Sequence, residues 1–259
     1  MNKIIAVHSY KGGTGKTLLS VNLAATFAKQ GKKVCIFDLD FRAPSLFAVL
    51  KAENSEVWFN DYLNNISDIN KVIVDLSSRI PGDGKLYASL ANPATEAIRD
   101  MSAKDRKWEM RALGRLLALR ESLLKEQKFD YLIFDTSPGL QYSSINAIVA
   151  ADFVVVATTG DRSDVDGTKR MLAELYNLFE KKTGLVLNKV IDPTANAKKA
   201  EISSRVKTTY QVPMLGLVPC FCEILRAEGN LIFVQDKPDH PFTKILGEMA
   251  RKIEANEVA

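Results

Sequence analysis

A short glycine-rich segment near the start of the sequence has the residues needed to bind phosphate groups. It reads SYKGGTGKT over 9–17 and follows the apolar run KIIAVH at 3–8. Its three glycines, at 12, 13 and 15, let consecutive backbone N–H groups approach phosphate oxygens, where side chains would block them. Lys16 is then expected to lie along the β- and γ-phosphates of a nucleotide, and the Thr17 hydroxyl to bind Mg²⁺. The order of strand, glycine loop and helix around this segment is the one that a phosphate-binding loop requires.

The same segment departs from the common phosphate-loop pattern GxxxxGK[ST] at one position. Tyr10 stands where the first glycine of that pattern is expected, and a second lysine, Lys11, follows it. One lysine, Lys16, is enough to hold nucleotide phosphates, so Lys11 requires a separate explanation.

Aspartates follow two further apolar runs. Asp135 ends the run in YLIFDTSPG, and Asp38 and Asp40 end the run in FDLDFRAPS. An aspartate at the carboxyl end of a strand beside the phosphate loop can hold the water shell of a magnesium ion. A further pair of carboxylates at that edge can orient an attacking water, since phosphoryl transfer depends mainly on positioning and charge stabilisation. The sequence therefore predicts a site for a magnesium nucleotide at one edge of a sheet.

Apolar runs of strand length alternate with longer helical patterns along the chain. The expected strands are 3–8, 33–38, 85–90, 131–135, 153–159, 184–190 and 213–219, and the expected helices include 16–30, 104–128, 142–150, 164–182 and 242–254. This alternation predicts an α/β fold: one P-loop NTPase domain over 1–259, with a mainly parallel twisted sheet and helices on both faces. Short helices and loops are expected over 51–84, and PGDGK at 81–85 is expected to be a turn.

Composition limits the environment of the protein. A hydrophobic fraction of 46% over 259 residues can fill one large core. The three cysteines, Cys35, Cys220 and Cys222, have spacings that build no disulfide framework, and the first residues do not have the pattern of a secretion signal. No run approaches the roughly 18 apolar residues of a membrane span. A cytoplasmic location is therefore expected.

The three motifs KGGTGKT, FDLDFRAPS and FDTSPG, in this order, resemble those of the MinD/ParA family of deviant Walker A ATPases, which includes the nitrogenase iron protein and metal-insertion ATPases. The resemblance covers most of the chain. It implies that Lys11 is the signature lysine, which crosses the interface of an ATP-bound homodimer to contact the phosphates held by the other subunit. A cation supplied in this way makes hydrolysis depend on dimerisation. The family does not require a glycine at the position of Tyr10.

The resemblance also implies roles for individual residues. Asp40 is the expected water-positioning residue of switch I with Asp38 supporting it, and Asp135 is the switch II magnesium residue. Asn188 in LVLNKV matches the asparagine that reads adenine, and Pro219 in LGLVP packs against the base. The expected catalytic residues are Lys11, Lys16, Asp40 and Asp38. The expected ATP-binding residues are Lys11, Gly12, Gly13, Thr14, Gly15, Lys16, Thr17, Leu18, Asn188 and Pro219, and the expected Mg²⁺ residues are Thr17, Asp135 and Asp40.

Two further segments bear on the cellular role. The final helical pattern, 242–254, is expected to dock on the core, and no basic membrane-targeting helix is evident after it. The segment 105–128, before the switch II strand, is expected to be a basic amphipathic helix. Lys107, Arg111 and Arg115, with Lys104 directly before the segment, are expected to form one stripe beside Trp108. The apolar face of this helix is expected to consist of Met110, Leu113, Leu117 and Leu124. Such a stripe suits nonspecific DNA or an acidic partner, or is a solvated helix face.

The resemblance thus predicts an ATPase that depends on Mg²⁺, hydrolyses ATP slowly and is stimulated by an unidentified partner protein. Spatial positioning or segregation of a cellular cargo is the expected role. One alternative is a metallocentre-maturation ATPase in which Cys220 and Cys222 of two subunits form a tetrahedral thiolate site. The other is an ATP-dependent synthetase of the same fold, although such enzymes need no lysine supplied by a partner.

Overall fold

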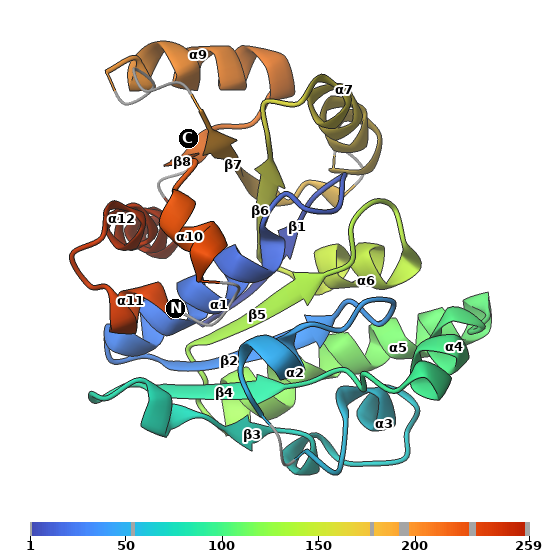
Figure 1. The fold of residues 1–259 in the computed structure, drawn as a ribbon. Coiled ribbons are helices and arrows are strands. Elements are labelled where there is room, and N and C mark those ends of the chain that lie inside the picture. The colour runs from blue at the N-terminus through green and yellow to red at the C-terminus, as the bar shows by residue number, and fades with distance from the viewer. Residues whose placement is uncertain (1, 53–54, 177–178, 192–196, 228–231, 257–259) are drawn as a thin grey trace.

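The computed structural model describes residues 2–52, 55–176, 179–191, 197–227 and 232–256. Its strands are β1 (Lys3–His8), β2 (Lys33–Leu39), β3 (Val74–Asp75), β4 (Lys85–Ser89), β5 (Tyr131–Thr136), β6 (Phe153–Thr158), β7 (Lys182–Val190) and β8 (Met214–Pro219). They form one eight-stranded sheet in the order β3-β4-β2-β5-β1-β6-β7-β8 (Figure 1). All neighbouring pairs are parallel except β3 and β4. The predicted mainly parallel sheet is confirmed.

Helices cover both faces of this sheet (Figure 1). They are α1 (Lys16–Lys29), α2 (Leu46–Val49), α3 (Phe59–Leu63), α4 (Thr95–Ser102), α5 (Arg106–Leu119), α6 (Tyr142–Ala150), α7 (Arg162–Met171), α9 (Lys199–Tyr210), α10 (Cys222–Arg226), α11 (Phe233–Asp236) and α12 (Pro241–Ala255). Short 3₁₀ helices span Ile69–Lys71 and Ser77–Arg79, and π-helical turns span Arg120–Glu126 and Leu172–Tyr176.

The two faces of the sheet carry separate apolar cores. Side chains of α1, α11 and α12 form the core on one face, and those of α3, α5, α6 and α9 form the core on the other. Because both faces are covered, a central strand such as β1 is buried along its whole length. This explains why the strands appear in the sequence as continuous apolar runs rather than alternating ones. The expected core-docked helix near the C-terminus is α12, in which Phe242, Leu246 and Ile253 are fully buried.

Several boundaries differ from those expected. The helix expected from 164 begins at Arg162, because the Asp161 side chain caps it by accepting from the Ser163 and Asp164 N–H groups. The edge strand β3 has two residues, too few to show a periodicity in the sequence. The turn predicted at PGDGK is a bend over 82–84 with Gly82 at φ +141°, and the last residue of the segment, Lys85, already belongs to β4.

The expected apolar face of the 105–128 segment was wrong in part: Leu124 is buried as predicted and Leu113 is half-buried, but the other two residues are exposed. Met110 and Leu117 are 68% and 46% exposed, whereas the buried positions of α5 are Trp108, Ala112, Leu116 and Leu119. Trp108 packs in the apolar core with these residues, and its indole N–H donates to Asn64 Oδ1 at 2.8 Å, a contact with a distant segment. The exposed basic side chains of Lys107 and Arg111 remain on the outer side.

The sheet register brings the predicted site residues together. Asp38 on β2 and Val7 on β1 are both paired with Asp135 on the intervening strand β5. Because the three strands are parallel, the loops that leave their carboxyl ends emerge at the same edge of the sheet. The glycine loop, Asp40 and the segment after Asp135 therefore surround one space.

Candidate nucleotide-binding site

The glycine loop leads directly from β1 into α1. Gly13 and Gly15 have φ of +77° and +95°, conformations that side chains with a Cβ rarely adopt. The loop ends at Lys16, the first residue of α1, so the positive end of a 14-residue helix points at the loop. This arrangement of N–H groups and helix end favours the binding of phosphate oxygens.

A cavity of about 520 Å³ lies beside the loop. It is lined by Gly12, Gly13, Gly15, Lys16, Thr17, Leu18, Asp40, Arg42, Ala43, Ser137, Pro138 and Gln141. Lys16 is buried, and this burial lowers the pKa of its ammonium group, while the carboxylates of Asp135 and Asp40 oppose the shift. A buried cation beside an open cavity is suited to neutralise an anionic ligand.

Asp135 has a buried oxygen that suits a metal-bound water. Its Oδ1 accepts from Ser20 Oγ at 2.9 Å, whereas its Oδ2 is buried and accepts no hydrogen bond from any residue that the structure describes. A buried acceptor of this kind is costly unless a ligand or water satisfies it. Together with the Thr17 hydroxyl at the start of α1, it forms a set of oxygen donors that fits Mg²⁺.

The environment of Asp135 also shifts its titration. Burial raises the pKa of Asp135 to about 6, although the neighbouring hydroxyls of Thr17 and Ser20 and the Lys16 ammonium oppose the shift. An acid whose pKa is higher in the folded than in the unfolded chain destabilises the fold when it is ionised. This penalty is complete above about pH 6, falls between about pH 6 and pH 4, and is absent at lower pH.

We therefore expect Asp135→Asn to raise the free energy of unfolding of the nucleotide-free chain by about 2 kcal/mol at pH 8. The gain should fall to about a third of that value at pH 4.5 and disappear only below about pH 4, where the wild-type carboxyl is protonated in both the folded and the unfolded chain. Urea unfolding of both chains in EDTA at the two pH values measures the difference. A gain that is the same at pH 4.5 and pH 8 would contradict this account of Asp135.

The two switch I aspartates have different positions. Asp38 is fully buried, and its carboxylate accepts the backbone N–H groups of Asp40, Ser45 and Leu46 at 3.0 to 3.2 Å. Burial raises the pKa of Asp38, and the nearby Asp135 carboxylate adds to the effect. Asp40 instead lines the cavity. Asp38 thus shapes the loop on which Asp40 is presented.

Ser137, which the sequence did not single out, joins the two switch segments. Its Oγ donates to Asp40 Oδ1 at 2.9 Å, and the Ala43 N–H donates to the same oxygen at 3.2 Å. Ser137 is two residues beyond Asp135, so it connects the ends of β2 and β5. The sequence contained no signal for this contact, because 97 residues separate its partners.

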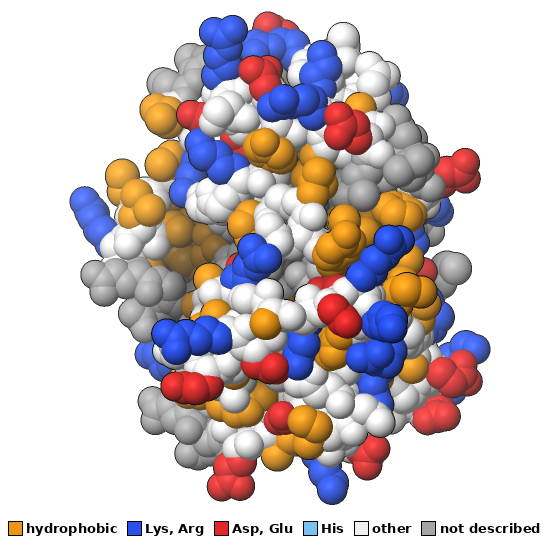
Figure 2. All heavy atoms as spheres, turned by 90° about the vertical axis from the view of Figure 1, so that its right-hand side faces the viewer, with side chains coloured by type: hydrophobic (Ala, Val, Ile, Leu, Met, Phe, Trp, Pro, Cys, Tyr) orange, Lys and Arg blue, Asp and Glu red, His pale blue; other side chains and the backbone are white. Residues whose placement is uncertain are grey.

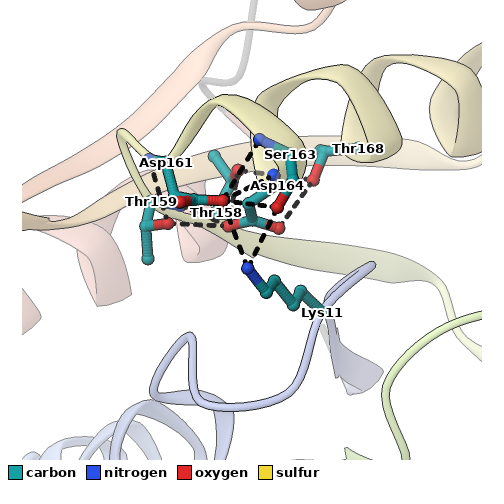
Figure 3. A network of polar contacts seen from close by, with 7 residues as sticks. All are labelled: Lys11, Thr158, Thr159, Asp161, Ser163, Asp164 and Thr168. Carbon is teal, nitrogen blue, oxygen red and sulfur yellow. Dashed lines mark hydrogen bonds and ion pairs between the residues drawn. The ribbon is translucent and has the colours of Figure 1, made fainter.

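Lys11 does not line the 520 Å³ cavity. Its Nζ donates to Asp161 Oδ1 at 3.2 Å and to Ser163 Oγ at 3.0 Å, at the start of α7 (Figure 3). The Ser163 hydroxyl and the Lys11 ammonium lower the pKa of Asp161 to about 2. Both partners of the ion pair are half-exposed, at 50% and 55%. A pair this exposed is weak, so Lys11 can leave it at little cost.

The start of α7 is itself held firmly to β6. Asp164 is fully buried, and its carboxylate accepts from the Thr159 N–H at 2.7 Å and from the hydroxyls of Thr158, Thr159 and Thr168 (Figure 3). The pattern Asp-x-x-Asp at 161–164 is a helix-start signal that could have located this network in the sequence. The partner of Lys11 is therefore fixed in place while Lys11 itself extends from a loop.

Tyr10 has a packing role at the same place. A Cβ placed on Gly167 of α7 would lie 2.0 Å from the Tyr10 ring, so the ring lies directly on the glycine. The Ser9 carbonyl next to it accepts the Gly139 N–H at 2.9 Å. The tyrosine thereby anchors the start of the phosphate loop between α7 and the segment after β5.

The two predicted adenine-site residues lie at the ends of β7 and β8. Neither Asn188 nor Pro219 is among the described residues that line the 520 Å³ cavity. Asn188 is buried, and its Nδ2 donates to the Thr14 carbonyl of the phosphate loop at 2.7 Å. Pro219 is half-buried at the last position of β8. Their roles toward the base remain predictions.

Two predicted features away from this cavity can also be located. Cys220 and Cys222 are both exposed, and Cys222 is the first residue of α10. Within the described parts of the chain, no group of three His, Cys, Asp or Glu side chains is placed to hold a metal ion. None of the described helices is both long and apolar enough to cross a membrane.

A phosphate loop at a helix start, a buried lysine, a threonine hydroxyl and a strand-end aspartate together define a P-loop nucleoside triphosphate-binding protein. Comparison with protein families matches residues 2–192 to the family described as AAA domain. The chain is 28% identical to the septum site-determining protein MinD of Synechocystis sp. over 261 residues. The aligned region covers 100% of this chain and 91% of that protein.

Two other proteins extend the comparison. A cytosolic Fe–S cluster assembly factor of Bos taurus is 26% identical over 269 residues, 96% of this chain and 91% of that protein. The solved structure of the septum site-determining protein MinD from Pyrococcus horikoshii, complexed with Mg-ADP, shares the fold with a TM-score of 0.76 and 22% identity over 100% of this chain and 99% of that one. The chain belongs to this AAA domain family and, within it, to the MinD/ParA family of P-loop ATPases.

Proposed function

We propose that this chain is an ATP-binding and ATP-hydrolysing dimerisation switch. The observation that carries the proposal is the separation of the two loop lysines: Lys16 lines the 520 Å³ cavity, whereas Lys11 pairs with Asp161 of α7 and lines a different cavity of about 680 Å³. A lysine that does not line the cavity of Lys16 is available to a second subunit. Hydrolysis would then require the dimer, because the cation of Lys11 reaches the γ-phosphate only across the interface.

The surface around the loop supports an interface. Tyr10, Leu140 and Tyr142 are 37%, 48% and 58% exposed, and they lie in the phosphate loop and in the segment that follows β5. Figure 2 shows hydrophobic and basic side chains lying next to one another on the side of the molecule that carries α6 and α7. Apolar side chains exposed beside charged ones are typical of a surface that binds another protein.

Within each subunit the proposal assigns roles to residues of this chain. The loop N–H groups and Lys16 bind the phosphates, and Thr17 and Asp135 hold Mg²⁺ and its water shell. Mg²⁺ supplies charge neutralisation at the β- and γ-phosphate oxygens. Asp40 orients the water that attacks the γ-phosphorus, and the bond to the β–γ bridging oxygen breaks to give ADP and phosphate. Asn188 and Pro219 are proposed to contact adenine.

The proposed role of this switch is spatial positioning of a cellular cargo. The name of the Synechocystis relative, a septum site-determining protein, supports such a role. The ATP-bound dimer would bind the cargo or its carrier, and an activating partner would release it by stimulating slow hydrolysis. The exposed basic side chains of α5 also suit contact with the DNA backbone. Nonspecific DNA is therefore one candidate for the surface on which the dimer is held.

The first test is whether ATP produces a dimer. We expect sedimentation velocity to show a monomer with Mg-ADP and a doubling of mass with Mg²⁺ and a non-hydrolysable ATP analogue. A chain that stays monomeric with the analogue, while calorimetry shows it bound, would contradict the switch.

A second candidate, a metallocentre-maturation ATPase, is supported by the exposed thiols of Cys220 and Cys222 and by the name of the Bos taurus relative. The two roles differ in metal binding. If the chain positions a cargo, the double variant Cys220→Ser/Cys222→Ser should dimerise with ATP and bind zinc no less tightly than the unmodified chain. Zinc binding at one ion per dimer that is lost in the double variant would favour metallocentre maturation instead.

A further inference from the structure

Two adjacent residues at the end of β7 contact two adjacent carbonyls of the phosphate loop. Asn188 Nδ2 donates to the Thr14 carbonyl at 2.7 Å, and Lys189 Nζ donates to the Gly13 carbonyl at 2.7 Å. About 175 residues of sequence separate the donors from the acceptors. The contact therefore exists only because β7 and the phosphate loop meet at the same edge of the sheet.

The backbone of β7 is deformed where it makes these contacts. Lys189 has a φ of +57°. Seven of the described residues other than glycine have a positive φ, and among these Lys189 is the one that lies within a strand. The pairing of β7 with β8 also shifts register between Leu187 and Val190. The left-handed conformation is unfavourable for a lysine, so other contacts must maintain it. Here it allows consecutive side chains to point toward the loop instead of alternating across the sheet.

The Asn188 carboxamide is oriented from both ends. Its Oδ1 accepts the Lys189 N–H at 2.8 Å, while its Nδ2 donates to Thr14. A Cβ placed on Gly15 would lie 2.4 Å from this Nδ2. If the amide oxygen and nitrogen exchanged places, the oxygen would face the Thr14 carbonyl and the NH₂ group would face the Lys189 N–H, so neither hydrogen bond could form. The amide is thus locked directly against the glycine loop.

These contacts determine the direction of two peptide groups. In a planar trans peptide the C=O and the N–H point in opposite directions. The Gly13 carbonyl belongs to the peptide that carries the Thr14 N–H, and the Thr14 carbonyl belongs to the one that carries the Gly15 N–H. Holding both carbonyls toward β7 turns both N–H groups to the other side of the loop. Donors held in place before the ligand arrives need no reorganisation on binding.

We propose that Asn188 and Lys189 are positioning residues that aim the Thr14 and Gly15 N–H groups at the phosphates of a bound nucleotide. The inference rests on the proposed ATP-binding function and deepens it. In this role Asn188 and Lys189 affect the binding of the phosphates, whatever base the nucleotide carries. A role of Asn188 in reading adenine would instead affect only ligands that contain adenine.

The test replaces the exposed lysine, which avoids disturbing the core around Asn188. In Lys189→Met, titration calorimetry with Mg²⁺ should show ATP and inorganic tripolyphosphate weakened by the same factor, about five- to tenfold. Lys189→Arg should restore most of the affinity for both, because a guanidinium can also donate to the Gly13 carbonyl. Lys199→Met is the matched control, since Lys199 is an exposed lysine on α9 that pairs with Glu248, and it should bind both ligands as the unmodified chain does.

The outcomes separate the alternatives. Loss of ATP affinity with unchanged tripolyphosphate affinity would overturn the inference and point to a contact with the nucleoside, and so would unchanged affinity for both ligands. A failure of the proposed function itself would appear differently, as an unmodified chain that does not bind ATP.

Discussion

Replacing Lys11 by alanine is expected to lower the rate of ATP hydrolysis about 10³-fold or more, the effect of removing a cation supplied in trans from related phosphoryl-transfer sites. Binding of ATP to the monomer should change by less than about threefold, because Lys11 does not line the cavity that Lys16 lines. The lysine is expected to act after binding, on the charge that develops at the γ-phosphate of the other subunit. Calorimetry and a phosphate-release assay measure the two effects separately.

The matched control is Lys199→Ala. Lys199 resembles Lys11 in exposure, 46% against 50%, and in its ion pair, 3.1 Å against 3.2 Å, but it lies on α9 and pairs with Glu248. Its loss should leave hydrolysis within about twofold of the unmodified rate, as expected for an exposed pair. If Lys11→Ala instead weakened ATP binding by the monomer as strongly as it slowed hydrolysis, Lys11 would serve its own site and the proposal of a trans lysine would fail.

Replacing Asp40 by alanine should lower hydrolysis about 10²- to 10⁴-fold, the usual contribution of a residue that handles the attacking water. In contrast to Lys11→Ala, this variant should accumulate as an ATP-bound dimer, because nothing that holds the two subunits together is removed. Size exclusion in Mg-ATP would show the dimer persisting for long after the unmodified chain has returned to monomer. A stable ATP dimer of this kind is also suited to isolating the unknown partner from a lysate.

Asp40→Asn separates catalysis from loop structure. An asparagine oxygen can still accept from Ser137 Oγ and the Ala43 N–H, so the switch I loop should keep its conformation. The charge is lost, and we expect hydrolysis to remain as slow as in Asp40→Ala. Nearly normal hydrolysis by Asp40→Asn would mean that the aspartate acts through the loop and not on the water.

Much of the site could be predicted from short stretches of sequence. The glycine loop was recognisable because its requirements are local: small residues where the backbone approaches phosphate, and a strand before and a helix after. Asp135, Asp38 and Asp40 could be placed at one edge because parallel strands end together. The apolar face of α5 was assigned in part wrongly, because the helix offers two sets of apolar residues at helical spacing, and it is the set Trp108, Ala112, Leu116 and Leu119 that packs in the core. Apolar identity alone favoured the exposed Met110.

The sequence by itself therefore determined the class of protein and the parallel sheet, and it predicts the residues that would meet a phosphate, since local backbone requirements and hydrophobic runs encode them. The tertiary structure decided where the side chains of those residues point. In the folded chain Lys11 donates to Asp161 at the start of α7, and Asp38 accepts from the switch I backbone. Asn188 and Lys189 donate to carbonyls of the phosphate loop. The hydrogen bonds of Lys11, Asn188 and Lys189 join segments at least 150 residues apart, so they exist only once the sheet has brought those segments together. Those of Asp38 are local, within eight residues, but they depend on the conformation of the loop after β2.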